Sequence, residues 1–142
     1  MTKQRFSVRP EARSPRIDVW VWPTYGALRA RAKGLGLRYY RKCLAFTQVW
    51  ADPVKGKFAE IHLCEKALSA EIVSHEAAHA VLGWAHMKGF APQVFDVQLD
   101  ASRVSDHEER LCYALGKVVQ DITTELWDRG YYGRRPEKET KG

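Results

Sequence analysis

The spacing of apolar residues predicts a strand near the start of the chain. Residues 16–22, RIDVWVW, place Ile17, Val19 and Val21 on one side and Asp18 with two tryptophans on the other. A period of two is typical of a strand with one buried face. Residues 41–50 and 57–66 are also strand-like, and the turn-forming Pro53 and Gly56 lie between them. These two runs therefore predict a β-hairpin.

Three other segments carry helix signals. Residues 23–36 form a short basic stretch in which Thr24 is a candidate N-cap and Gly34 a candidate C′ residue, just beyond the helix end. Ser69 is placed to cap a second helix that ends near Met87. The third helix is expected to begin near Ser102 or Ser105 and to end near Arg129. Its apolar positions follow a period of 3.6: Val104, Leu111, Leu115, Val118, Val119, Ile122 and Leu126.

These elements predict a single α+β domain over residues 16–129, with a small antiparallel or mixed sheet. Residues 1–15 are expected to form a flexible basic arm and residues 130–142 a flexible polar tail. A chain of 142 residues is long enough to bury a core. Three scattered cysteines do not form a disulfide framework, and Cys43 and Cys64 are expected to act as small core residues.

Charge and hydropathy narrow the class of protein. No run of about 20 apolar residues predicts a membrane span. The N-terminus lacks an apolar signal segment, so a cytoplasmic location is expected. Lys and Arg number 23 against 17 Asp and Glu. The excess is concentrated in residues 3–16 and 29–42, which indicates either a solubilising surface or proximity to nucleic acid.

The helix expected after Ser69 contains a motif with metal chemistry. Residues 75–79, HEAAH, match HExxH. On a helix, His75 and His79 lie one turn apart on one face, where both imidazoles can bind one Zn²⁺. Glu76 lies beside them, near a metal-bound water. The alternative, an inert pair of hydrogen-bonded histidines, would bury Glu76 with no evident partner, at a cost in free energy.

A catalytic zinc needs a third protein ligand. His86 comes one residue too late for the spacing HExxHxxGxxH, as does Gly83. Thermolysin-like enzymes take a glutamate from a second helix. The apolar stripe of the last helix points Glu108 inward and Glu109 about 100° away from it, so Glu108 is the preferred ligand.

Other roles for these residues stay open. Glu108 also completes a capping-box pattern that begins at Ser105. His107, Glu109 and His86 are the alternative third ligands, and His86 is also a candidate proton donor.

The chain resembles the small zinc peptidases of the gluzincin type, and more narrowly the ImmA/IrrE family and related phage- and mobile-element-encoded metallopeptidases. The resemblance rests on residues 59–83, AEIHLCEKALSAEIVSHEAAHAVLG, and on residues 108–122, EERLCYALGKVVQDI. It implies a minimal zincin fold in which an edge strand, expected at residues 58–64, runs beside the HExxH helix. His62 of that strand is expected to face solvent. The chain departs from the family pattern at Leu111 and Cys112, after the glutamate.

These features predict a zinc-dependent endopeptidase, with a regulatory role, that binds one Zn²⁺ per chain and hydrolyses a protein or peptide substrate. His75, His79 and Glu108 would hold the metal, and Glu76 would activate a water. One alternative is a SprT-like protease that acts on DNA-bound proteins, with a histidine as third ligand. Another is an inactive module that binds DNA or protein through its basic surface. A structural zinc closed by Cys112 or His107 is a third.

Overall fold

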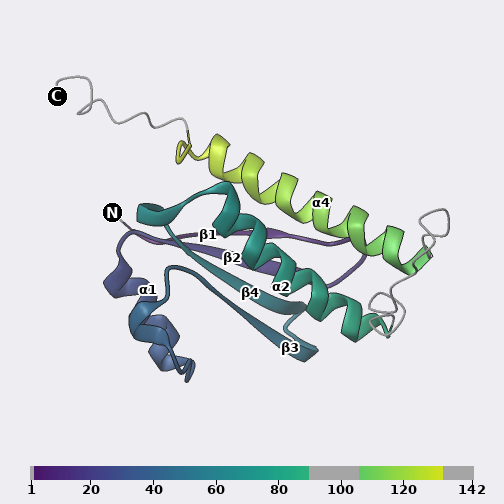
Figure 1. Cartoon of the computed structure of the whole chain (residues 1–142), viewed down its shortest axis with the longest axis horizontal. Coiled ribbons are helices and arrows are strands. Elements are labelled where there is room, and N and C mark those ends of the chain that lie inside the picture. Colours follow the sequence, from purple (N-terminus) through teal and green to yellow (C-terminus); the bar gives the residue numbers. More distant parts are fainter. Residues whose placement is uncertain (1, 90–105, 133–142) are drawn as a thin grey trace.

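A computed structural model describes residues 2–89 and 106–132 of the chain. It is an α+β structure with a four-stranded mixed sheet (Figure 1). The strands are β1 (Gln4–Val8), β2 (Arg16–Trp22), β3 (Phe46–Val54) and β4 (Lys57–Cys64). The α-helices are α1 (Tyr25–Gly34), α2 (Ala70–Lys88) and α4 (Asp106–Asp128), and short 3₁₀ turns cover Tyr40–Lys42 and Glu65–Ala67.

The sheet has the strand order β1-β2-β4-β3. β2 pairs with β4 in parallel, and the other two pairings are antiparallel. The predicted hairpin is confirmed, and its turn residues Lys55 and Gly56 have φ of 54° and 82°, as in the tight turns that suit a twisted hairpin. The edge strand beside α2 is β3. The expectation that residues 58–64 form this edge is therefore wrong, because β2 occupies the other side of β4.

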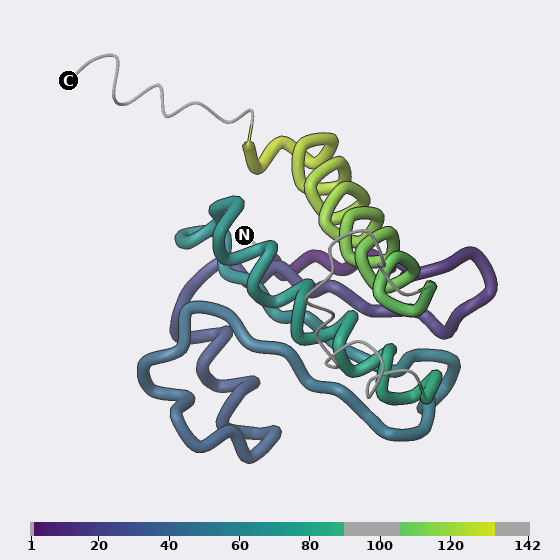
Figure 2. The backbone as a smooth tube through the Cα atoms, turned by 45° about the vertical axis from the view of Figure 1, so that its right-hand side comes forward, coloured from purple at the N-terminus to yellow at the C-terminus, as the bar shows by residue number. Residues whose placement is uncertain are grey.

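One face of the sheet carries the main core. The predicted inward face of β2 is confirmed, since Ile17, Val19 and Val21 are fully buried. Helices α2 and α4 lie side by side over this face and run in opposite directions (Figures 1 and 2). The buried positions of α4 continue the predicted stripe and are Ala114, Val118, Ile122 and Leu126. We call this the inner face of the sheet.

Helix α1 packs on the opposite, outer face. Leu28 and Ala32 of α1 form a second cluster with Phe46 and Cys64. The Thr24 side chain accepts a hydrogen bond from the Ala27 backbone N–H, which confirms the predicted cap. The prediction of Gly34 as the C′ residue is wrong: Gly34 is the last helical residue, Leu35 is the C-cap, and the glycine with positive φ is Gly36.

The N-terminal segment is part of the fold. Residues 1–15 were expected to be a flexible basic arm, but β1 pairs with β2 along its length. Phe6 and Val8 enter the core because they lie opposite Val19 and Ile17 on the inner face. The predicted helix start at Ser102 or Ser105 and the position of Val104 lie outside the described residues, as does the tail beyond residue 132.

The outer face also contains a buried polar pair, Glu60 and His62. The expectation that His62 faces solvent is wrong: it is fully buried, and its ring stacks on Phe46 with centroids 4.4 Å apart. Trp22 Nε1 donates to His62 Nδ1 at 3.0 Å, and His62 Nε2 lies 2.9 Å from Glu60 Oε1. Because Nδ1 accepts, the proton of the neutral ring lies on Nε2. Burial lowers the pKa of His62 to about 4.

Candidate metal centre

The two histidines of the HExxH motif converge at the surface of α2. Their Nε2 atoms lie 3.2 Å apart, and the ring planes meet at 74°. Two nitrogen ligands of one tetrahedral zinc, each at about 2.0–2.1 Å from the metal, would be separated by about 3.3 Å. His75 and His79 are both exposed, so an ion can reach them from solvent. The donor type and spacing of this pair therefore fit two positions of a zinc site.

The sequence holds α2 in place at both ends. The Ser69 side chain accepts a hydrogen bond from the Ile72 backbone N–H at 3.1 Å, which confirms the predicted N-cap. At the other end, Gly89 has φ of 81°, a left-handed conformation that suits glycine. The buried positions of α2, such as Ala77 and Ala80, pack against the inner face. The histidines lie on the opposite side of the helix and face outward.

Glu76 differs from the histidines because it is buried, with 7% of its surface exposed. The Thr47 hydroxyl of β3 lies 2.6 Å from Glu76 Oε1 and donates to it, and it also lies 3.2 Å from the Glu76 backbone carbonyl oxygen. Glu76 Oε2 makes no hydrogen bond with any residue in the described part of the chain. One carboxylate oxygen is thus held by the edge strand, and the other is available to accept a proton.

The approach of β3 to α2 depends on Gly83. A Cβ atom built at Gly83 would lie 2.5 Å from Val49 Cγ1 and 3.1 Å from Cγ2. Such distances are far below ordinary van der Waals contact, so only glycine allows the strand this close. This packing brings Thr47, two residues before Val49, to Glu76. Gly83 therefore serves the site by its small size, and not by the spacing of the longer zinc motif.

A groove runs between β3 and the outward side of α2. Its middle is a hollow of about 390 Å³ whose lining includes His75, Glu76 and His79 from the helix and Thr47 from the strand. Neighbouring hollows share lining residues with it on both sides. One is lined by Leu44, Ala45, Glu71, Ile72, His75 and Glu76, and the other by Val49, Trp50, Ala51, Gly83, His86 and Met87. The HExxH residues therefore open onto a groove that follows the edge strand.

The structure does not bring Glu108 to the histidine pair. Helix α4 is antiparallel to α2, and the Arg110 guanidinium lies 5.6 Å from the Trp84 ring, near the end of α2. Trp84 follows His79 by about 7.5 Å along the helix axis, and His75 by about 13.5 Å. Glu108, His107 and Glu109 all lie in the first turn of α4, at that same end.

His86 is also too far away to share an ion with the pair, since two helical turns after His79 correspond to about 10.5 Å. Among residues 2–89 and 106–132, no group of three or more His, Cys, Asp or Glu side chains is placed to hold one metal ion. The described residues thus supply two of the predicted ligands and the predicted base.

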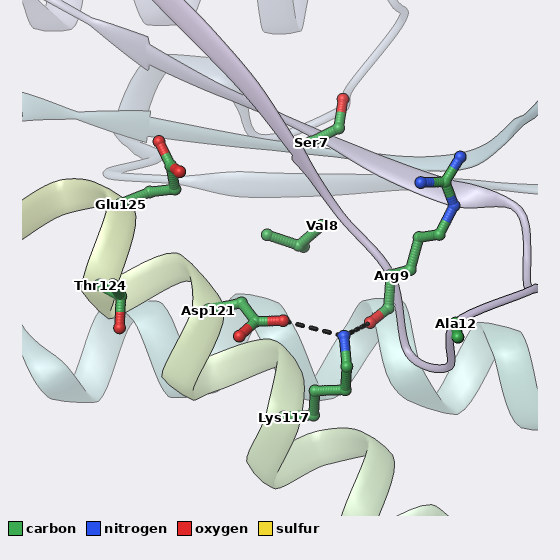
Figure 3. Close-up of a pocket in the computed structure, with 8 residues that line it drawn as sticks. All are labelled: Ser7, Val8, Arg9, Ala12, Lys117, Asp121, Thr124 and Glu125. Carbon is green, nitrogen blue, oxygen red and sulfur yellow. Dashed lines mark hydrogen bonds and ion pairs between the residues drawn. The ribbon is translucent and has the colours of Figure 1, made fainter. Parts of the chain in front are cut away.

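A second groove, of about 400 Å³, lies between β1 and α4 (Figure 3). Lys117 Nζ donates to the Arg9 carbonyl oxygen at 3.0 Å and pairs with Asp121 at 2.9 Å, which links the helix to the strand. None of the predicted site residues lines this groove. Its full lining is Ser7, Val8, Arg9, Ala12, Lys117, Asp121, Thr124 and Glu125.

No protein-family model, curated protein or solved structure matches this chain. The resemblance to the zinc peptidases therefore stays a prediction. In the described part of the chain, no helix has the length and apolar character needed to cross a membrane. The chemistry of the site has to be inferred from its own geometry.

Proposed function

We propose that the protein is a zinc-dependent endopeptidase whose metal is held in part by His75 and His79. The observation that carries the proposal is the 3.2 Å separation of two exposed Nε2 atoms beside a buried carboxylate. An inert pair of surface histidines would not require a carboxylate buried next to it. Burying Glu76 costs free energy, and Thr47 offsets only part of that cost with one hydrogen bond.

Bound zinc would supply Lewis acidity, lowering the pKa of a coordinated water and polarising the scissile carbonyl. The side chains of the chain supply the proton transfers. Glu76 would accept the proton of the attacking water at Oε2 and deliver it to the nitrogen of the leaving amine. The Thr47 hydroxyl would fix the other oxygen, Oε1, and so orient the carboxylate during both transfers.

The substrate that fits this groove is an extended peptide. β3 lies at the edge of the sheet and pairs with β4 on one side only within the described residues. An extended chain can add to such an edge through backbone hydrogen bonds. The strand then aligns the peptide with the HExxH residues, because Thr47 and Val49 line the same hollow as both histidines. A protein segment without fixed structure would present its backbone in this way.

The metal site is tested by zinc content after dialysis. The wild-type protein should bind one equivalent, and His75→Ala and His79→Ala should each lose it. His86→Ala is the matched control, since it removes an exposed histidine two turns along the same helix, and it should keep the zinc. Glu108→Gln should also keep the zinc, because Glu108 lies in the first turn of α4, near the end of α2 and away from the two histidines. Zinc retained in both His75→Ala and His79→Ala would refute the site.

The activity is tested by cleavage of a mixture of quenched fluorescent peptides by the zinc-loaded protein. Cleavage should stop on addition of a chelator and return with zinc. If the protein binds zinc but cleaves no peptide or unfolded protein, the proposal of peptidase activity is refuted and only a zinc-binding function is supported.

A further inference from the structure

The outer face of the sheet carries a row of stacked rings. Strand register places Trp20 opposite His62, and His62 opposite Phe46. The ring centroids are 6.2 Å apart for Trp20 and His62, with planes 4° apart, and Trp22 stacks on Trp20 at 5.8 Å. Helix α1 and its neighbours pack against Trp22 and Phe46. Trp20 lies outside that cluster and is partly exposed.

Two exposed cations lie over these indoles. Lys3 Nζ is 5.0 Å from the centroid of Trp20 and 5.3 Å from that of Trp22, and the Arg5 guanidinium is 5.2 Å from Trp20. Neither Lys3 nor Arg5 forms an ion pair with a described residue. Both can therefore turn from the rings toward an anion without breaking a salt bridge.

The carboxylates of this face are already neutralised. Asp18 is paired with Arg16 at 2.8 Å and accepts from the Ser7 hydroxyl. Glu60 is paired with Lys57 and lies 3.5 Å from Arg31. The surrounding sequence is strongly basic, since residues 1–50 contain 11 Lys and Arg and two Asp and Glu, whereas residues 51–142 have an acidic excess. The net positive charge of the chain thus originates in the part that builds this face.

We propose that the outer face binds single-stranded nucleic acid. Bases stack on aromatic rings while cations beside them contact the phosphates, and this combination is what Trp20, Lys3 and Arg5 present together. An acidic protein would use the cations but not the rings. A duplex would hide its bases from them. The proposal does not depend on zinc.

The test is the binding of a fluorescein-labelled 15-mer of thymidylate to the full chain, in buffer that contains EDTA. Affinity should fall as salt rises. Lys3→Gln combined with Arg5→Gln should weaken binding and reduce the slope of log affinity against log salt by about 1.4, because each phosphate contact contributes about 0.7 for single strands. Trp20→Leu should weaken binding about 5- to 150-fold, as expected for loss of one stacked base.

Matched variants on other surfaces supply the controls. Lys88→Gln removes an exposed charge at the end of α2, and Trp127→Leu removes an exposed tryptophan from α4. Both should bind like the wild type. Circular dichroism must show that each variant is folded, and if Trp20→Leu is not, the Lys3 and Arg5 variant decides. The proposal is overturned if the 15-mer does not bind at 50 mM salt, if the controls weaken binding equally, or if a duplex or polyglutamate competes as well as unlabelled thymidylate.

Discussion

Lowering the pH should destabilise the protein through His62. The ring is fully buried and neutral, because its Nδ1 accepts from Trp22 while its Nε2 donates to Glu60. Protonating it in the native state would break the Trp22 hydrogen bond and bury a charge. Burial accordingly lowers the pKa to about 4 from the ordinary value of 6.5. Between these two values the unfolded chain takes up a proton that the native protein does not.

The size of the effect follows from proton linkage. The free energy of unfolding falls by about 1.4 kcal/mol for each pH unit below 6.5, and by roughly 3 kcal/mol when pH 4 is reached. This is a large share of a typical stability of about 5–15 kcal/mol. Burial alone would raise the pKa of Glu60, but hydrogen bonds from Lys57 and His62 outweigh it and lower the pKa. Glu60 therefore contributes stability that is lost only below about pH 4.5. With EDTA present to remove zinc bound at His75 and His79, the window from pH 6.5 to 4.5 isolates His62.

The assay is urea unfolding, followed by tryptophan fluorescence, at intervals between pH 7 and pH 4.5. His62→Gln is the control, since its amide can still accept from Trp22 and donate to Glu60 without titrating. This variant should be less stable at pH 7 and should show little change across the window. A wild-type stability that is constant from pH 6.5 to 4.5, or an equal slope in His62→Gln, would refute the assignment of a buried neutral histidine.

Two substitutions test the packing of β3 against α2. Thr47→Val should keep zinc bound but slow peptide cleavage about tenfold, because Glu76 loses its orienting hydrogen bond. Thr47→Ser keeps the hydroxyl and should retain most of the wild-type rate. Equal cleavage rates in the wild type and both variants would show that Thr47 does not act in the site. Gly83→Ala should lower the free energy of unfolding by about 1–3 kcal/mol in urea titrations, because its Cβ would overlap Val49. Adding Val49→Ala should recover part of that loss, and a Gly83→Ala protein as stable as the wild type would contradict the close contact.

Local patterns predicted most of the elements. The alternation in residues 16–22 gave the inner face of β2, and the caps at Thr24 and Ser69 are both confirmed. The strand order could not be predicted, because the parallel pairing of β2 with β4 joins segments about 40 residues apart. β1 was missed for a related reason. Its alternation is short and lies among basic residues, and only the pairing with β2 buries it.

In the candidate site too, local spacing could be predicted from the sequence and long-range contacts could not. The i, i+4 spacing fixes His75 and His79 on one face of a helix, so sequence alone placed them together. Thr47 carried no local signal, because its contact with Glu76 spans 29 residues. For Glu108, periodicity indicated that the side chain points to the inward side of α4. It did not indicate which end of α2 lies next to the first turn of α4. The antiparallel packing of the two helices decides that position.

If the proposed function is correct, peptide cleavage at the zinc site depends on Glu76 as a proton acceptor. The most direct measurement is the zinc content and the peptide cleavage rate of Glu76→Gln, determined on the same sample as the wild type. Both proteins should contain one equivalent of zinc, and the variant should cleave the peptide more slowly by at least about a hundredfold. An unchanged rate in Glu76→Gln, with zinc bound, would contradict this role of Glu76.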